Sequence, residues 1–490
     1  MVQRPQRDGL QAWRREAEKI NVAQALLYFR QQAGLSFDRR ELDRLEKRAI
    51  QHYKAFVTGF GRSPEVLFNI SSLEIAASKT YKLHLKLSNL RMTKIASRRY
   101  KVNGAPVNWG SWRQFASGTD DSKARKEVFD DFLQKSSALA PTVRSRFDAI
   151  ARSMSELGTD PLANYLASEG IEYDRLVSLI DALGRRIRPA FGESLARFSQ
   201  EILGRASEYY DDLYFFRARV FRKYAGNFLP KVDPVGQIVG TMAKMGLDAR
   251  AVKVDDANRK GKSPSAFCFP IRIPSDVRIA YRRANPLEDF TGIFHEMGHG
   301  IHFSSILGRA PYEDKYGISK GVAETFSLYF ESLLHDKDYL QHGLGLSELV
   351  ASDLADRFRF VEQFTMTFYA ANAIMKLRYW KDRLSVDEAS KLYSDLTAKY
   401  MGVRYPGEYW LLHHMMPEDI LYTPAIPVAT VRAFELKCAL SSMFGQRPWQ
   451  EKGAGQFLLE LMRPGRRIQL DRFSRLDPSP FIRSLTVAAS

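Results

Sequence analysis

The sequence predicts a mainly α fold with a small β-hairpin, and three observations carry this prediction. The 490 residues include 45% hydrophobic residues, an ordinary globular share that excludes a disordered or low-complexity chain. Apolar residues recur at helical spacing through most of the chain. The clearest pair of β-prone segments, 266–273 and 277–281, consists of two short runs joined by a turn, which is typical of a hairpin.

Amphipathic patterns predict helices over 39–56, 124–133, 174–203 and 349–377. The segment 82–88 alternates like a strand, but its Leu and Lys are good helix formers, so it receives no assignment. Breakers cluster at 103–110, 226–236 and 405–407. We place a boundary near Gly226, which divides an N-terminal helical half (1–225) from a C-terminal half (226–490) with seven of the nine histidines.

Pro270 lies inside the first strand of the predicted hairpin. Because proline cannot donate a backbone hydrogen bond, it confines this strand to the edge of a sheet or to a bulge.

Charge and cysteine content exclude several classes of protein. The net charge is +17, yet acidic and basic residues alternate along the helices, as in 38–48, so we expect no nucleic-acid partner. The sequence begins without an apolar leader and has no uncharged run near 18 residues, so we expect a cytoplasmic protein without a membrane partner. Cys268 and Cys438 cannot form a cysteine cluster, so any metal must be held by histidines and carboxylates.

The strongest functional signal lies in a predicted helix that begins after the N-cap candidate Asn285 and ends at Gly308. At about 100° per residue, its apolar residues and its histidines occupy different sides. His295, Glu296 and His299 form the pattern HExxH. Histidines at i and i+4 lie one turn apart, so both can bind one zinc ion while the intervening glutamate lies near the reacting water. The pattern predicts His295 and His299 as zinc ligands and Glu296 as the general base.

Two glycines, Gly298 and Gly300, lie next to these residues. A glycine costs about 0.5–1 kcal/mol in a helix interior, so we expect another element to pack closely against the helix there. His302 lies on the same side as the ligands, and we expect it to support them.

Catalytic zinc needs a third protein ligand and an open fourth position. The extended pattern HExxHxxGxxH is excluded, because this chain has histidine and serine where that pattern has glycine and histidine. The predicted helix 322–334 offers a carboxylate instead. Glu324, Ser327 and Glu331 share one face of it, at i, i+3 and i+7. We predict Glu324 as the third ligand and Glu331 as the group that accepts a proton from a ligand imidazole.

These residues resemble the thimet oligopeptidase and oligoendopeptidase F family of zinc metallopeptidases. The resemblance rests on HEMGHGIH (295–302), GVAETFSLYFE (321–331) and the preceding strand SAFCFPI (265–271), with weaker similarity in 122–132 and 457–466. It implies a helical bowl or clamshell with a deep channel, one zinc ion at its floor, and cleavage of short peptides. The two halves of the chain would then pack together around that channel.

The resemblance also implies roles for the edge strand and for a late segment. In the family an edge strand pairs with the substrate backbone, and the late segment, here 413–427, brings a histidine and tyrosines towards the scissile carbonyl. His413 or His414 and Tyr422 are the candidates. Family members usually have several tyrosines there, so a packing role for Tyr422 is the alternative. The matching substrate-binding residues of the edge strand are Ala266, Phe267, Cys268 and Phe269.

Together these features predict an oligoendopeptidase that binds one zinc ion per chain and hydrolyses internal bonds of short peptides. A helical zinc metallocarboxypeptidase is the nearest alternative, because it could share the same ligands. It would also need a cationic group for the C-terminal carboxylate of the substrate. A helical binding scaffold without catalytic activity is the alternative from another class. The sequence makes no prediction of the oligomeric state.

Overall fold

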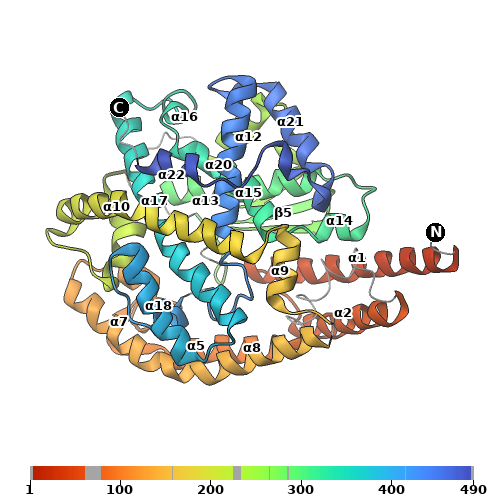
Figure 1. The fold of residues 1–490 in the computed structure, drawn as a ribbon, viewed down its shortest axis with the longest axis horizontal. Helices are drawn as coiled ribbons and strands as arrows, with labels where there is room; N and C mark the ends of the chain where they lie inside the picture. The colour runs from red at the N-terminus through yellow and green to blue at the C-terminus, as the bar shows by residue number, and fades with distance from the viewer. Residues whose placement is uncertain are drawn as a thin grey trace.

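The fold is known from a computed structural model that describes residues 4–60, 79–156, 158–224, 233–263, 265–283, 286–413 and 415–486. Helices contain 71% of the residues and strands are confined to two small sheets (Figure 1). The predicted mainly α class is therefore confirmed.

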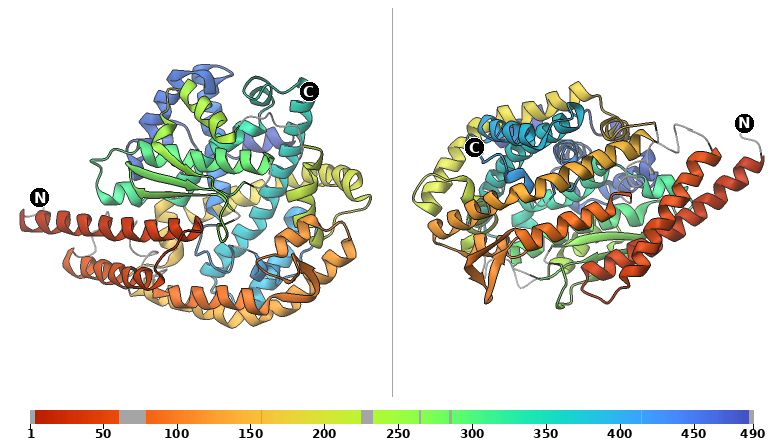
Figure 2. Two further views of the ribbon diagram at one scale, coloured as in Figure 1. Left: turned by 180° about the vertical axis from the view of Figure 1, so that it is seen from behind. Right: turned by 90° about the horizontal axis from the view of Figure 1, so that it is seen from below.

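The N-terminal helices α1 (Arg4–Gln32) and α2 (Arg39–Phe60) form a pair that projects from one side of the molecule (Figure 1). The last turns of α1 lie along the strand β4 (Phe267–Arg272), as Figure 2 shows from behind. Phe29 packs edge-on against Phe269, with ring centroids 5.7 Å apart. The first helix of the chain therefore covers one face of the strand that was predicted to bind substrate.

The described residues between 79 and 244 are mostly helical. The predicted helices 124–133 and 174–203 lie within α7 and α10, and the unassigned segment 82–88 belongs to α5. Breakers at Asn103 and Gly104, both with positive φ, form the turn of a hairpin that the sequence did not predict. The elements are α5 (Tyr81–Lys94), β1 (Ala96–Val102), β2 (Ala105–Asn108), α6 (Trp112–Gly118), α7 (Ser122–Ser136), α8 (Ala140–Ser155), α9 (Pro161–Glu169), α10 (Tyr173–Leu203), α11 (Asp212–Tyr214) and α12 (Pro234–Lys244).

The second sheet has three strands in the order β3-β5-β4. β4 and β5 (Asp276–Ala280) pair antiparallel, which confirms the predicted hairpin. Pro270 lies at a register shift, and β4 is an edge strand, as the proline requires. The parallel strand β3 (Val252–Asp255) was not predicted, because four residues carry too little pattern.

The C-terminal part is almost entirely helical. The predicted end of the zinc helix at Gly308 is wrong: α13 ends at Ser305, and the backbone N–H of Leu307 turns away to the carbonyl of Arg463 (3.1 Å). Asn285, its predicted N-cap, lies outside the described residues. The helices are α13 (Pro286–Ser305), α14 (Tyr312–Tyr316), α15 (Lys320–Glu331), α16 (Lys337–His342), α17 (Glu348–Lys381), α18 (Val386–Met401), α19 (Tyr409–Leu412), α20 (Ala425–Phe444), α21 (Lys452–Met462) and α22 (Ser479–Thr486).

Short helical turns connect these elements. Within the described ranges, every helix is too short or too polar to span a membrane. The short turns are η1 (Ser137–Leu139), η2 (Tyr209–Asp211), η3 (Phe215–Arg219, a π turn), η4 (Arg222–Tyr224), η5 (Ala249–Ala251), η6 (Ser332–His335), η7 (Pro448–Gln450), η8 (Gly465–Arg467) and η9 (Leu470–Arg472).

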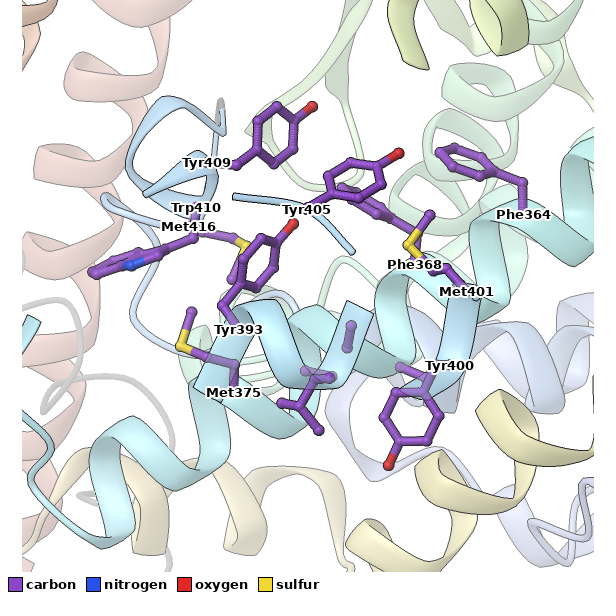
Figure 3. Packing of buried hydrophobic residues seen from close by; sticks show 14 of the residues in the cluster. Phe364, Phe368, Met375, Tyr393, Tyr400, Met401, Tyr405, Tyr409, Trp410 and Met416 are labelled. Atoms are coloured by element: carbon purple, nitrogen blue, oxygen red, sulfur yellow. The ribbon is translucent and has the colours of Figure 1, made fainter. Parts of the chain in front are cut away.

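Two large hydrophobic cores hold the molecule together. The first core surrounds α7, α10, α18 and the second half of α17, and Figure 3 shows part of it. The second core surrounds α12, α13, α15 and α21. Two helices belong to both cores: α17 contributes Phe358 to the second and Phe360 to the first, and α20 contributes Val431 to the first and Ala433 to the second. The predicted division at residue 225/226 falls outside the described residues and stays a prediction.

A cavity of about 1690 Å³ lies between segments of both cores. Its wall includes residues of α6, α13, α15, α17 and α20. Glu331, at the end of α15, is part of this wall. The cavity therefore reaches the two helices that carry the HExxH pattern and its downstream glutamate.

Candidate metal centre

The centre is built where α13 crosses α15, and two glycines make the crossing possible. A Cβ atom on Gly298 would lie 2.6 Å from the carbonyl oxygen of Phe326 and from Cα of Ser327. On the other side, a Cβ atom on Gly300 would lie 2.9 Å from Cγ1 of Val252 in β3. The expected close packing at both glycines is confirmed, and it brings the backbone of α15 directly against the HExxH turn.

This crossing brings three donor groups to one point. Oε2 of Glu324 lies 3.3 Å from Nε2 of His295 and 3.5 Å from Nε2 of His299. A tetrahedral zinc centre with bonds of about 2.0–2.1 Å separates its ligand atoms by about 3.3–3.4 Å. The three residues form the group of described histidines, cysteines and carboxylates that could hold a metal ion, and their spacing fits zinc.

Hydrogen bonds from neighbouring residues orient two of the three candidate ligands. Nδ1 of His295 lies 2.8 Å from Oε2 of Glu331, which directs Nε2 of the same ring towards Glu324. The carboxylate of Glu324 accepts hydrogen bonds from both sides. Oγ of Ser327 donates to Oε2 (2.9 Å), and the hydroxyl of Tyr422 donates to Oε1.

The charges at this point call for a cation. Burial alone would raise the pKa of Glu324, but the charge of His299 and the hydrogen bonds of both histidines hold it well below its usual range. Burial alone would lower the pKa of His295, but the hydrogen bonds and charges of Glu324 and Glu331 raise it well above 6.5. The carboxylates of Glu324 and Glu331 therefore stay ionised. Their negative charge favours a positive charge beside them, which is either a proton on His295 or a metal ion. Two imidazoles and one carboxylate are a donor set that zinc accepts in peptidases.

The helix α13, which carries Glu296, packs against the edge strand β4, and the charge of Glu296 acts on Cys268 of this strand and on Tyr422. Burial and the negative charge of Glu296 raise the pKa of the Cys268 thiol well above its usual value, which places the thiol and the carboxylate near each other. One turn earlier on α13, a Cβ atom on Gly292 would lie 3.6 Å from Cβ of Ala266. The strand residues predicted to bind substrate therefore run along α13 beside Glu296. Phe267 is partly exposed and Phe269 packs under α1.

The late segment reaches the centre through Tyr422. Its hydroxyl is bonded to Glu324, and burial together with the charge of Glu324 raises its pKa, so it stays protonated. His413 is buried, and its Nδ1 accepts hydrogen bonds from the backbone N–H groups of Met415 (3.2 Å) and Met416 (3.3 Å). Neutral His413 therefore carries its proton on Nε2. His414 lies outside the described residues.

The structure surrounds His302 with aromatic rings. Its ring lies 4.4 Å from that of Phe326 and 5.2 Å from that of Phe303, measured between centroids. Neither ring nitrogen has a hydrogen-bond partner among the described residues. Burial and the charge of His299 lower its pKa to about 3. The prediction that His302 supports the metal ligands stays a prediction. The contacts of its ring with Phe303 and Phe326 are those of a core residue.

Sequence reasoning did not predict that Tyr422 bonds to Glu324. The two residues are 98 positions apart, and no spacing rule connects them. A signal for Ser327 was present, because its position three residues after Glu324 places both on one helix face.

Comparisons with known proteins identify the fold in which this site lies. No protein-family model and no curated protein sequence matches the chain. Among solved structures, the M32 carboxypeptidase from Deinococcus radiodurans R1 matches with a TM-score of 0.62 and 15% identity over 98% of both chains. A structure assigned as an oligoendopeptidase F from Bacillus anthracis strain Ames has a TM-score of 0.61 and 13% identity, over 91% of this chain and 82% of that chain. PZ peptidase A with an inhibitor has a TM-score of 0.55 and 14% identity, over 94% and 82%.

These likenesses extend over nearly the whole chain, although few residues are identical. They include proteins described as oligopeptidases and as carboxypeptidases, with similar scores for both. The chain therefore has the fold of the zinc peptidases that include oligoendopeptidase F, PZ peptidase and the M32 carboxypeptidases, with His295, His299 and Glu324 grouped as a possible metal site.

Proposed function

We propose that the protein is a zinc metallopeptidase that hydrolyses internal bonds of short peptides. The observation that carries this proposal is the position of His295, His299 and Glu324. Oε2 of Glu324 lies from each imidazole Nε2 at close to the separation that a tetrahedral zinc ion requires, and the three ligand atoms lie within 4.8 Å of one another. Glu296 lies one residue from His295 on the same helix.

Bound zinc would supply Lewis-acid activation of water and of the peptide carbonyl. Glu296 accepts the proton of the attacking water and transfers it to the leaving amine. Glu331 keeps His295 in one orientation, and Ser327 with Tyr422 keeps Glu324 in place. In the reaction, Nε2–H of His413 donates a hydrogen bond to the oxyanion, or the hydroxyl of Tyr422 does so after it leaves Glu324.

The strand β4 supports a peptide as the substrate. It is an edge strand, and among the described residues no strand pairs with its outer edge. An extended peptide can add to such an edge through backbone hydrogen bonds, whatever its side chains. Residues 266–269 run beside Glu296, so a peptide bonded to them would bring its carbonyl groups close to the metal centre. The cavity offers the space for the rest of a short peptide.

The first test measures zinc content and peptide cleavage in the same preparations. We expect one zinc per chain by elemental analysis, and cleavage of an internally quenched peptide. Glu296→Gln should keep the zinc and lose turnover by several orders of magnitude, because the base is gone. Glu460→Gln, an exposed carboxylate on α21, is the matched control. A chain without stoichiometric zinc would instead support the binding scaffold.

A zinc metallocarboxypeptidase is the second candidate, because the M32 carboxypeptidase matches 98% of both chains. Peptides with an amidated C-terminus distinguish the two candidates. An endopeptidase cuts them as it cuts the free acid, whereas a carboxypeptidase needs the free carboxylate. Mass spectrometry of the products identifies the bond that is cut. Release of single C-terminal residues from the free acid alone would replace the endopeptidase proposal with the carboxypeptidase.

A further inference from the structure

The segment 412–423, which carries His413 and Tyr422, has an unusual set of contacts. Its described residues, 412–413 and 415–423, have little secondary structure of their own, yet five of their backbone carbonyls accept hydrogen bonds from side chains of other elements. Buried carbonyls need such partners, but here they come from four separate parts of the fold. The donors are Trp109 to Leu412 (3.2 Å), Arg91 to His413 (3.1 Å), Lys376 to Met416 (2.6 Å), Arg146 to Glu418, and Trp380 to Ile420 (2.6 Å).

Three of these donors are buried cations. Arg91, Arg146 and Lys376 are at most 5% exposed. Burying a charged group is costly unless ionic partners and hydrogen bonds compensate it. The segment supplies both, because Glu418 pairs with Arg91 (2.9 Å) and Asp419 lies 4.0 Å from Lys376. These charges connect the segment to α5, α8 and α17.

The chain before this segment is anchored as well. Tyr409 and Trp410 of α19, together with Met416, pack into the first core, as Figure 3 shows. The segment then leads directly into α20, which passes through both cores. Both ends of the segment are therefore held.

A continuous series of contacts runs from Lys376 to the metal centre. Asp419 is its middle member: Oδ1 lies near Lys376 and accepts a hydrogen bond from the backbone N–H of Tyr422 (2.8 Å). Oδ2 accepts a hydrogen bond from the hydroxyl of Thr423. The side chain of Tyr422 then donates to Glu324. Asp419 thus fixes the backbone of the residue whose side chain holds a candidate metal ligand.

We propose that Asp419 is a positioning residue, which acts through Tyr422 to hold Glu324 in the geometry that binds zinc. The inference rests on the proposed function only in assigning zinc to the centre. The side-chain contacts of Asp419 are with Lys376, Tyr422 and Thr423, and none of these is a candidate ligand. Its effect on the centre therefore disappears when the hydroxyl of Tyr422 is removed.

A double-mutant cycle tests this dependence. The variants are Asp419→Ala, Tyr422→Phe and the combination, and zinc affinity is measured by competition with a chelator. Loss of a group that orients a metal ligand typically weakens zinc binding by about 10- to 100-fold. We expect each single variant to fall in this range and the double variant to bind zinc as weakly as the weaker single variant. If the two losses multiply instead, Asp419 acts independently of Tyr422 and the inference is wrong.

Two further variants separate positioning from general stability. Asp121→Ala removes a carboxylate that accepts two backbone hydrogen bonds at the start of α7, and it should leave zinc affinity unchanged. Asp419→Asn keeps one oxygen that can accept from Tyr422 N–H, so it should recover part of the affinity lost in Asp419→Ala. An Asp419→Asn variant no better than the alanine variant would count against the backbone contact.

The zinc measurement does not depend on peptidase activity. If the wild-type protein binds zinc and cleaves no peptide, the proposed function fails and the cycle still decides the role of Asp419. If the protein cleaves peptides and the cycle is additive, the proposed function stands and the role of Asp419 fails.

Discussion

Gly298→Ala tests whether the contact between α13 and α15 sets the spacing of the candidate metal ligands. The added Cβ atom would lie 2.6 Å from the Phe326 carbonyl oxygen and from Cα of Ser327, both of them backbone atoms. An ordinary contact begins near 3.4 Å, so one helix must move by about 0.8 Å. Neither of these atoms can rotate away as the end of a side chain could.

The movement would affect the ligand geometry more than the fold. Forcing an extra methyl group into a packed site costs about 1–3 kcal/mol, against a gain of about 0.5–1 kcal/mol from replacing glycine in a helix. The net loss of stability is then about 0–2.5 kcal/mol. A shift of α15 lengthens the 3.3 and 3.5 Å separations between Glu324 and the histidines, beyond those of a tetrahedral centre. We therefore expect zinc affinity to fall by about 10- to 100-fold, as for other disturbed ligands.

Chelator competition measures the zinc affinity, and thermal unfolding in EDTA measures the stability without metal. Gly292→Ala is the matched control, because the same change on the same helix meets only Cβ of Ala266 at 3.6 Å. That variant should bind zinc normally and unfold at the same or a higher temperature. If Gly298→Ala binds zinc as tightly as Gly292→Ala, the helix contact does not set the ligand spacing.

Three further predictions concern residues around the centre. Glu331→Gln should weaken zinc binding by about 10- to 100-fold, because His295 loses the carboxylate that orients it; chelator competition measures this loss. Arg432→Met should lower the free energy of unfolding by about 3–5 kcal/mol, because it leaves the buried carboxylate of Glu169 without its ion pair; urea unfolding in EDTA measures this change. Burial lowers the pKa of Lys376 from 10.5 to about 8, so between these pH values the unfolded chain binds more protons than the folded one. Wild-type stability relative to Lys376→Met should therefore rise between pH 8 and 10.5, by at most about 3.4 kcal/mol.

Each of these predictions has its own control. Glu331→Gln should leave unfolding in EDTA nearly unchanged, so a large loss there would show a structural effect. The double variant Glu169→Gln/Arg432→Met should recover part of the stability lost in Arg432→Met, since no buried charge then lacks a partner. For Lys376→Met, a difference from wild type that stays constant across the pH range would contradict the lowered pKa.

Much of the candidate metal centre could be predicted because its sequence signals are local. The spacing of His295, Glu296 and His299 predicts one helix face, and the glycines predict the close contact that Gly298 makes. The strand β4 could be placed at a sheet edge because proline removes a backbone donor. Such rules depend on a few neighbouring residues and on fixed helix or strand geometry.

The contacts that the sequence did not reveal join distant parts of the chain. Arg91 reaches the carbonyl of His413 across 322 positions, and Arg432 reaches Glu169 across 263. Arginine and lysine lie on the surface of most proteins, so nothing in the sequence distinguishes these buried cations from solvated ones. The strand β3 escaped prediction because its four residues pair in parallel with a strand that follows 20 residues later.

The passage of α17 and α20 through both hydrophobic cores has a mechanical consequence. α17 alone contains 34 residues, which corresponds to roughly 50 Å of continuous helix. The two cores cannot swing apart about a flexible joint, because any widening of the cavity must bend both helices. A wide opening of the cavity would break backbone hydrogen bonds within α17 and α20, so only small changes in its width have a low free-energy cost. For the peptidase proposed above, a cavity held at a nearly constant width would admit extended peptides more readily than folded domains.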